Sequence, residues 1–265
     1  MMTRNFKFKS VHDVVVQIYD AKADKNNEMT AVLLPAIGVP IVKYERFIHQ
    51  LSQIGFTVIA ADYPYCGANT PHVNKSINYN YRDLIEGFIP ELLKQSSTKK
   101  TILIGHSLGG HLATLFATTT TIPVIGIATG NVHYANWQGI ERLKILGFAA
   151  FIKSMCKVYG YFPGYKVGFG RKETKDLMKN WCHTVLHGNY TFYADPLPKA
   201  DVLGYFISIH NDSFAPLRST ESLADNFLEN QIVIVKLPVE TKGNPHSAWL
   251  KNPEAIVSHI KNYRM

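Results

Sequence analysis

Short runs in which nearly every residue is apolar constrain the fold of this 265-residue chain more than any other feature. A strand with one face in water alternates apolar and polar residues, whereas a strand covered on both faces is apolar throughout. Continuous runs predict buried strands at 30–34, 56–61, 101–105, 122–129, 202–209 and 231–237. The earlier run 12–19 alternates and predicts an antiparallel strand.

Longer segments with apolar residues at three- and four-residue spacing lie between these runs. They predict helices at 42–54, 81–95, 108–118, 216–228 and 252–263. Gly55 is expected to end the first helix, and Pro90 to kink the second. Alternation of strands and helices predicts an α/β fold, with a mostly parallel central sheet and helices on both faces.

The alternation is interrupted between residues 131 and 200. This segment contains two helical patterns, 140–159 and 172–186, and no convincing strand. Ligands bind at the carboxyl edge of the sheet in such folds, so we expect a helical cap over that edge. The predicted organisation is a core of residues 1–130 and 201–265 with a cap of residues 131–200 inserted in it.

Charge and cysteine content exclude several classes of protein. The net charge is +8, but the basic residues are scattered and no basic run exceeds two residues, as at Lys99-Lys100. We therefore expect no nucleic-acid partner. Three cysteines without a CxxC pair do not form a disulfide framework and favour a reducing compartment.

Hydropathy favours a cytoplasmic protein. The N-terminal residues carry positive charge but no apolar stretch of signal-peptide length. We expect no membrane-spanning helix, because no window of about 18 residues is continuously apolar and the uncharged stretch 101–140 is broken by glycines and polar residues. The nearest candidate, 145–162, carries Lys153 and Lys157 in its middle.

The chemistry is predicted by Gly105-His106-Ser107-Leu108-Gly109, a Gly-x-Ser-x-Gly pattern between a predicted strand and a predicted helix. A serine on such a sharp turn projects its hydroxyl above the sheet, and glycines flank it because side chains would clash there. The bare pattern is weak, and the strand–turn–helix context strengthens it. Ser107 is the predicted nucleophile.

A nucleophilic serine needs a base and an acid that orients the base, and in this type of turn the chain order is Ser, acid, His. Asp212 follows the predicted strand 202–209 and precedes a helix, which makes it the predicted acid. Asp195 and Asp201 are the rivals, but neither follows a strand.

His246 is the predicted base, because it lies on the segment between the last predicted strand and the last helix. A loop there would let the imidazole reach over the sheet edge to Ser107. His259 falls within the terminal helix pattern, and His106 belongs to the strand before the serine, so its side chain points away. His210 is the next histidine to consider.

Two backbone amides are expected to form an oxyanion hole. One belongs to Leu108, directly after the nucleophile. The other comes from the turn after the strand 30–34, where Ile37 is the preferred donor and Ala36 the less preferred one.

With these motifs the chain resembles serine hydrolases of the α/β-hydrolase fold. More narrowly, it resembles the bacterial "predicted α/β hydrolase" group related to lysophospholipase-like and serine-aminopeptidase-like hydrolases. The resemblance rests on the serine turn, on segments 35–40, 55–63 and 160–170, and on Trp181-Cys182. In the family a glycine often directly precedes the triad histidine, whereas here Asn244 and Pro245 separate Gly243 from His246.

The resemblance implies hydrolysis of a carboxylic ester, thioester or amide. We expect a small-molecule ester or thioester substrate, and neither a cofactor nor a metal. His183 and His187 have metal-ligand spacing, but no third ligand is evident. Two alternatives stay open: a non-catalytic ligand-binding protein of this fold, and a lipid hydrolase that uses the helix 140–159 at a membrane surface. The membrane surface is the less favoured partner, and the sequence does not specify an oligomeric state.

Overall fold

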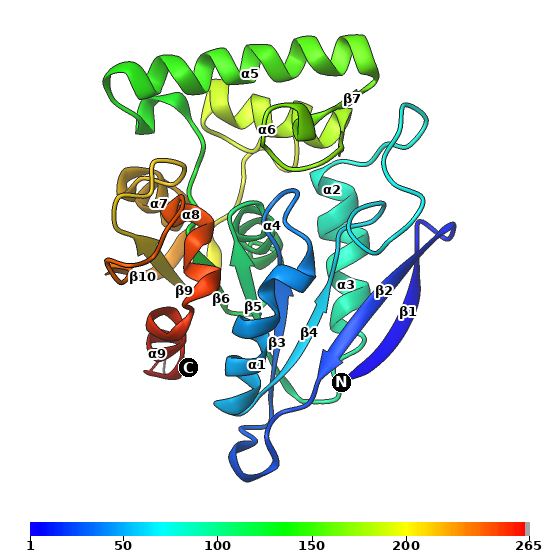
Figure 1. Ribbon diagram of the computed structural model, residues 1–265, viewed down its shortest axis with the longest axis vertical. Helices are drawn as coiled ribbons and strands as arrows, with labels where there is room; N and C mark the ends of the chain where they lie inside the picture. Colours follow the sequence, from blue (N-terminus) through cyan, green and yellow to red (C-terminus); the bar gives the residue numbers. More distant parts are fainter. Residues whose placement is uncertain (263–265) are drawn as a thin grey trace.

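The computed structural model describes residues 1–262 (Figure 1). Its central element is an eight-stranded sheet in the order β1-β2-β4-β3-β5-β6-β9-β10. β2 alone runs opposite in direction to the other strands of this sheet. The strands are β1 (Met2–Phe8), β2 (His12–Tyr19), β3 (Met29–Leu34), β4 (Phe56–Ala61), β5 (Lys100–His106), β6 (Val124–Ile127), β9 (Ala200–Ile209) and β10 (Phe227–Val235). The predicted α/β-hydrolase architecture is confirmed.

All seven predicted strands are present, and β1 is the one strand of the central sheet that the sequence pattern missed. In β1 only Phe6 and Phe8 are buried, while the other five residues are exposed. Its position is fixed by pairing with β2, where Phe6 lies opposite Val14. A strand with so few apolar residues carries no periodic signal of its own.

Helices cover both faces of the sheet. The α-helices of the core are α1 (Glu45–Gln53), α2 (Tyr81–Asp83), α3 (Ile89–Leu93), α4 (Leu108–Ala117), α7 (Leu217–Ala224), α8 (Pro245–Ala248) and α9 (Glu254–Asn262). Short 3₁₀ turns are η1 (Ala23–Lys25), η2 (Ile41–Tyr44), η4 (Tyr134–Asn136) and η6 (Trp249–Lys251). One apolar cluster joins the sheet to α1 and α9, and a second joins it to α3, α4 and α7.

Two helix predictions need correction. The predicted helix 216–228 ends at Ala224, because Phe227 already belongs to β10 and packs against Phe206 at a ring-centroid distance of 5.5 Å. The predicted helix 252–263 is α9, and Tyr263 lies outside the described residues.

The helix predicted at 81–95 widens into a π-helical turn, η3 (Leu84–Phe88), just before Pro90. Proline has no N–H to donate, and its ring clashes with the carbonyl four residues earlier. The wider turn is where a helix accommodates such a disturbance.

Residues 131–200, which we call the cap, lie between β6 and β9. They contain α5 (Gly139–Tyr159), η5 (Gly164–Lys166) and α6 (Lys175–His187). They also contain two strands of two residues each, β7 (Tyr161–Phe162) and β8 (Glu173–Thr174), which pair with each other and not with the central sheet. The expectation of a segment without strands was therefore wrong for this hairpin. Figure 1 shows α5 and α6 stacked above the end of the core from which α4 begins.

Candidate active site

The turn that carries Ser107 is sterically closed to larger neighbours. Ser107 itself has φ 53° and ψ −114°, a backbone conformation that residues other than glycine rarely adopt. A Cβ at Gly105 would lie 2.4 Å from the carbonyl carbon of Gly109, and a Cβ at Gly109 would lie 2.0 Å from the Leu34 carbonyl oxygen. Glycines are thus required for β5, β3 and α4 to approach one another here.

Three predicted side chains meet at this turn. The Ser107 Oγ lies 2.9 Å from Nε2 of His246, and Nδ1 of His246 lies 2.8 Å from Oδ2 of Asp212. All three come from the ends of strands or the segments that follow them: β5, β9 and β10. The structure therefore brings together the three residues that chain order had selected.

Asp212 is held by the backbone that follows it. Its Oδ1 accepts hydrogen bonds from the amides of Phe214, at 2.8 Å, and Ala215, at 3.2 Å. Its carboxylate is fully buried, with side-chain exposure of 0%. Asp201, by contrast, is exposed near the amino end of β9, and Asp195 is exposed in the loop before it. Neither rival acid is near the carboxyl end where Ser107 lies.

His246 was expected on a loop and instead lies in the first turn of the short helix α8. The Asn244 side chain caps this helix by accepting the His246 amide at 3.0 Å, and Pro245 occupies the first helical position. Asn244 and Pro245, the residues that depart from the family pattern, are thus the ones that start the helix that presents the imidazole.

A buried hydrogen-bond chain links the base to the turn after β3. The His246 carbonyl lies 2.8 Å from Nε2 of His106, and the Tyr44 hydroxyl lies 2.7 Å from Nδ1 of the same ring. Because a carbonyl only accepts, Nε2 of His106 carries the proton and Tyr44 donates to Nδ1. The Tyr44 oxygen in turn accepts the Ala36 amide at 2.7 Å.

This chain was not foreseen from the sequence, which placed His106 only in the strand before the serine. Burial lowers the pKa of His106 well below its usual range, so the ring is neutral and keeps one fixed tautomer. The Trp249 indole donates a second hydrogen bond to the His246 carbonyl at 3.1 Å. The backbone of the base is thereby held from two sides.

The same chain decides between the two candidate amides of the 35–40 turn. The Ala36 amide is engaged by Tyr44, whereas the Ile37 and Leu108 amides have no hydrogen-bond partner anywhere in residues 1–262. Ile37, Leu108 and Ser107 line one cavity. Of the two alternatives, only the Ile37 amide is available to a ligand.

That cavity, the catalytic cleft, has a volume of about 500 Å³ and lies between the core and the cap. Its polar centre is formed by Ser107 and His246. The surrounding wall is mostly apolar and comprises Val132, Trp137, Ile145, Phe148, Phe169, Trp181 and Phe214. Such a cleft, mostly apolar with a few convergent polar groups, is typical of small-molecule binding sites.

Other ionisable groups near the cleft are held neutral. Burial lowers the pKa of His111 to about 4, and its Nε2 donates to the Gly130 carbonyl at 2.7 Å. Burial raises the pKa of the Cys182 thiol to about 12. In the described part of the chain, no three His, Cys, Asp or Glu side chains cluster in a way that could hold a metal ion.

Comparison with known proteins supports the fold. A family model described as "alpha/beta hydrolase fold" matches residues 32–149. Lysophospholipase L2 from Escherichia coli (strain K12) is 26% identical over 136 residues. That alignment covers 46% of this chain and 40% of the enzyme, so less than half of the relative's length is matched.

Solved structures resemble the chain over nearly its full length. A soluble variant of monoglyceride lipase from Saccharomyces cerevisiae superposes with a TM-score of 0.70 at 12% identity, covering 98% of this chain and 93% of that one. An esterase from Exiguobacterium antarcticum superposes with a TM-score of 0.66 at 13% identity, and the match covers 99% of both chains.

Over residues 1–262, none of the helices has the length and apolarity to cross a membrane.

Proposed function

Because the chain is an α/β-hydrolase-fold protein, we propose that it is a serine hydrolase that cleaves a carboxylic ester or thioester. The observation that carries this proposal is the unbroken hydrogen-bond chain from Asp212 through His246 to Ser107. Hydrogen-bonded nucleophile, base and orienting acid form the arrangement that activates a serine hydroxyl.

The proposed reaction starts when Ser107 Oγ attacks the carbonyl carbon while Nε2 of His246 takes its proton. Asp212 stabilises the imidazolium and accepts a hydrogen bond from Nδ1–H of His246, so that Nε2 is the nitrogen that faces Ser107. The amides of Leu108 and Ile37 bind the oxyanion, and His246 protonates the departing alcohol or thiol. Water activated by His246 then releases the acid from Ser107.

An apolar acyl group is the substrate feature that the cleft supports best. Its walls are aromatic and aliphatic, and its volume suits an acyl chain more than a polar peptide. The names of the matched proteins, a lysophospholipase, a monoglyceride lipase and an esterase, favour ester substrates over amides.

Fluorophosphonate labelling tests the proposal directly, since the probe reacts with a serine whose base and oxyanion hole are in place. The probe should modify the peptide that contains Ser107, and labelling should vanish in Ser107→Ala and fall steeply in His246→Ala. His210→Ala is the matched control, because His210 is exposed after β9 and should be dispensable. If the folded wild-type protein takes up no probe, the non-catalytic binding protein becomes the better reading.

Hydrolysis at a lipid surface is a second candidate, and the outer face of α5 favours it. Leu143 and Val158 are 63% and 72% exposed on this face, with Ile140 and Phe151 also exposed. The helix is the outermost element of the cap in Figure 1. It carries four basic residues, Arg142, Lys144, Lys153 and Lys157, against the single acid Glu141. An exposed apolar face flanked by cations is typical of helices that lie on anionic membranes.

Vesicle flotation separates this candidate from a hydrolase of dissolved esters. Binding to phosphatidylglycerol vesicles should exceed binding to phosphatidylcholine vesicles and should fall in the double variant Leu143→Ser/Val158→Ser. Val42→Ser is the control, because Val42 is 63% exposed on the core, outside the cap. Equal flotation of the double variant and the wild type would remove the membrane role.

A further inference from the structure

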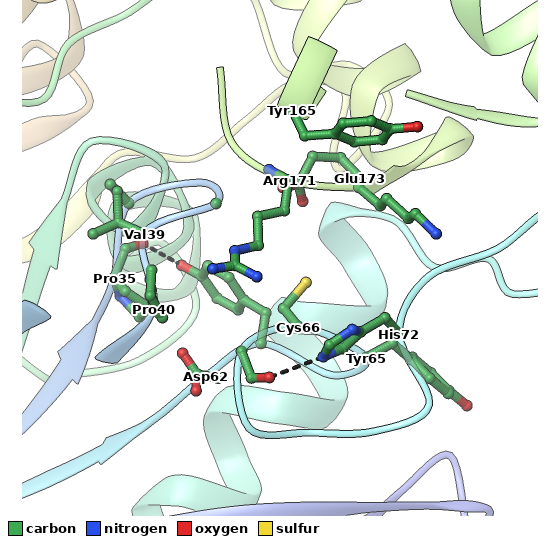
Figure 2. A pocket seen from close by; sticks show the side chains of 15 residues that line it. Pro35, Val39, Pro40, Asp62, Tyr65, Cys66, His72, Tyr165, Arg171 and Glu173 are labelled. Atoms are coloured by element: carbon green, nitrogen blue, oxygen red, sulfur yellow. Dashed lines mark hydrogen bonds between the residues drawn. The ribbon is translucent and has the colours of Figure 1, made fainter. Parts of the chain in front are cut away.

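A second cavity, of about 300 Å³, lies beside the turn 35–40, where Pro35, Val39 and Pro40 line it (Figure 2). Three segments enclose it: the turn 35–40 after β3, the loop 62–72 after β4, and cap residues 165–173. Neither Ser107 nor His246 lines it, and it shares only Ala36 and Val39 with the catalytic cleft.

A contact between the backbones of the turn 35–40 and the cap separates the second cavity from the catalytic cleft. A Cβ on Gly38 would lie 2.0 Å from the Cα of Gly170, so the two main chains touch. Gly38 faces the second cavity and Gly170 faces the catalytic cleft. A molecule in the second cavity would therefore occupy a different space from an ester in the cleft.

Two cationic side chains with no ion-pair partner in residues 1–262 line the cavity. Arg171 and Lys172 both line it, and among the described residues neither has a carboxylate within 4.0 Å. Figure 2 shows the Arg171 side chain extending from the cap segment toward the core side of the cavity. A guanidinium presents paired donors that match carboxylate and phosphate oxygens.

Two acids also line the cavity, but neither forms an ion pair with Arg171 or Lys172. The Asp62 carboxylate is buried and already accepts the amides of Ile41, at 2.7 Å, and Ala68, at 2.9 Å. Glu173 is 1% exposed, and its carboxyl accepts a long hydrogen bond, 3.4 Å, from the Arg171 amide, with no other side-chain hydrogen bond to residues 1–262. Burial raises the pKa of Glu173 to about 8, so the group is mostly protonated and can itself donate to an anion.

We propose that this cavity is a binding site for a small organic anion, a carboxylate or a phosphate monoester with an apolar body, held by Arg171. The buried Glu173 carboxyl lies at the same site, and the remaining wall accepts the apolar body. That wall includes Pro35, Val39, Pro40, Tyr63, Tyr65 and Cys66. The proposal does not require the reaction at Ser107, because it rests on the second cavity alone.

Calorimetric titration of the full-length protein tests this site with benzoate and phenyl phosphate as probes and benzyl alcohol as the neutral control. Both anions should bind, or one of them if the site selects carboxylate over phosphate, and the alcohol should not. Arg171→Gln should weaken binding about 10- to 100-fold, as expected when a charge-assisted hydrogen bond is lost. Lys172→Gln should weaken it less.

Two controls make the result decisive. Arg4→Gln removes an exposed arginine of β1 and should leave binding unchanged. Ser107→Ala alters the catalytic cleft and should also leave binding unchanged, whether or not Ser107 is a nucleophile. Binding of neither anion, equal binding of benzyl alcohol, full binding by Arg171→Gln, or loss of binding in Ser107→Ala would each overturn the proposal.

Discussion

Replacing Asp212 by asparagine should disable the proposed triad while leaving the fold intact. The reason is the fixed orientation that the new amide must take. The Oδ1 position faces the N–H groups of Phe214 and Ala215, so the amide oxygen must occupy it. The NH₂ group is then left in the Oδ2 position, 2.8 Å from Nδ1 of His246.

A donor at that position forces Nδ1 of His246 to accept and moves the ring proton to Nε2. Nε2 is the atom that faces Ser107 at 2.9 Å, and a protonated Nε2 cannot take the hydroxyl proton. In a serine-protease triad the wrong tautomer lowers kcat by about 10⁴. That factor corresponds to about 5 kcal/mol of lost transition-state stabilisation.

The assay is hydrolysis of p-nitrophenyl esters of increasing chain length, with unfolding in urea measured on the same samples. We expect Asp212→Asn to unfold within about 1 kcal/mol of the wild type, because both backbone hydrogen bonds to Oδ1 survive. Asp195→Asn and Asp201→Asn are matched controls and should keep full activity. Near-normal turnover by Asp212→Asn, or an equal loss in either control, would refute the assignment of the acid.

Three further predictions concern buried polar groups. Tyr44→Phe leaves the Ala36 amide and Nδ1 of His106 without a hydrogen-bond partner. The free energy of unfolding in urea should therefore fall by about 1–3 kcal/mol per unpaired group, and kcat should fall about tenfold or more at unchanged KM. A kcat equal to that of the wild type would contradict this prediction. Lowering the pH from about 6.5 to about 4 should destabilise the fold, because the unfolded state binds a proton at His111 before the folded state does; urea titrations that give a flat profile over this range would contradict it. Glu173→Gln should raise the melting temperature by an amount that grows from pH 4.5 to about 8, because unfolded Glu173 ionises in that window while the folded group stays protonated; a constant difference would contradict it.

The candidate site could be predicted from the sequence where local constraints and chain order act together. The glycines around Ser107 are demanded by backbone contacts within one strand–turn–helix unit, so they leave a contiguous motif. Asp212 follows from its place after a strand. The β4 strand, continuous and apolar, was predicted with its observed bounds.

Contacts between distant segments leave no such pattern. The Tyr44–His106 hydrogen bond joins positions 62 residues apart, and the bond from His106 to the His246 carbonyl spans 140 residues. Taken alone, Tyr44 and His106 each have the sequence context of an ordinary core residue. β1 was missed for a related reason, since its place depends on the neighbouring strand and not on its own hydropathy.

The backbone of Ser107 implies a conflict between stability and activity at one position. Its φ of 53° and ψ of −114° cost a residue with a Cβ about 1–3 kcal/mol, a penalty that glycine would avoid. Glycine at this position would therefore make the folded state more stable, and the surrounding contacts must offset the strain of the serine backbone. Selection for thermal stability alone, with no requirement for hydrolysis, would therefore be expected to replace the proposed nucleophile itself.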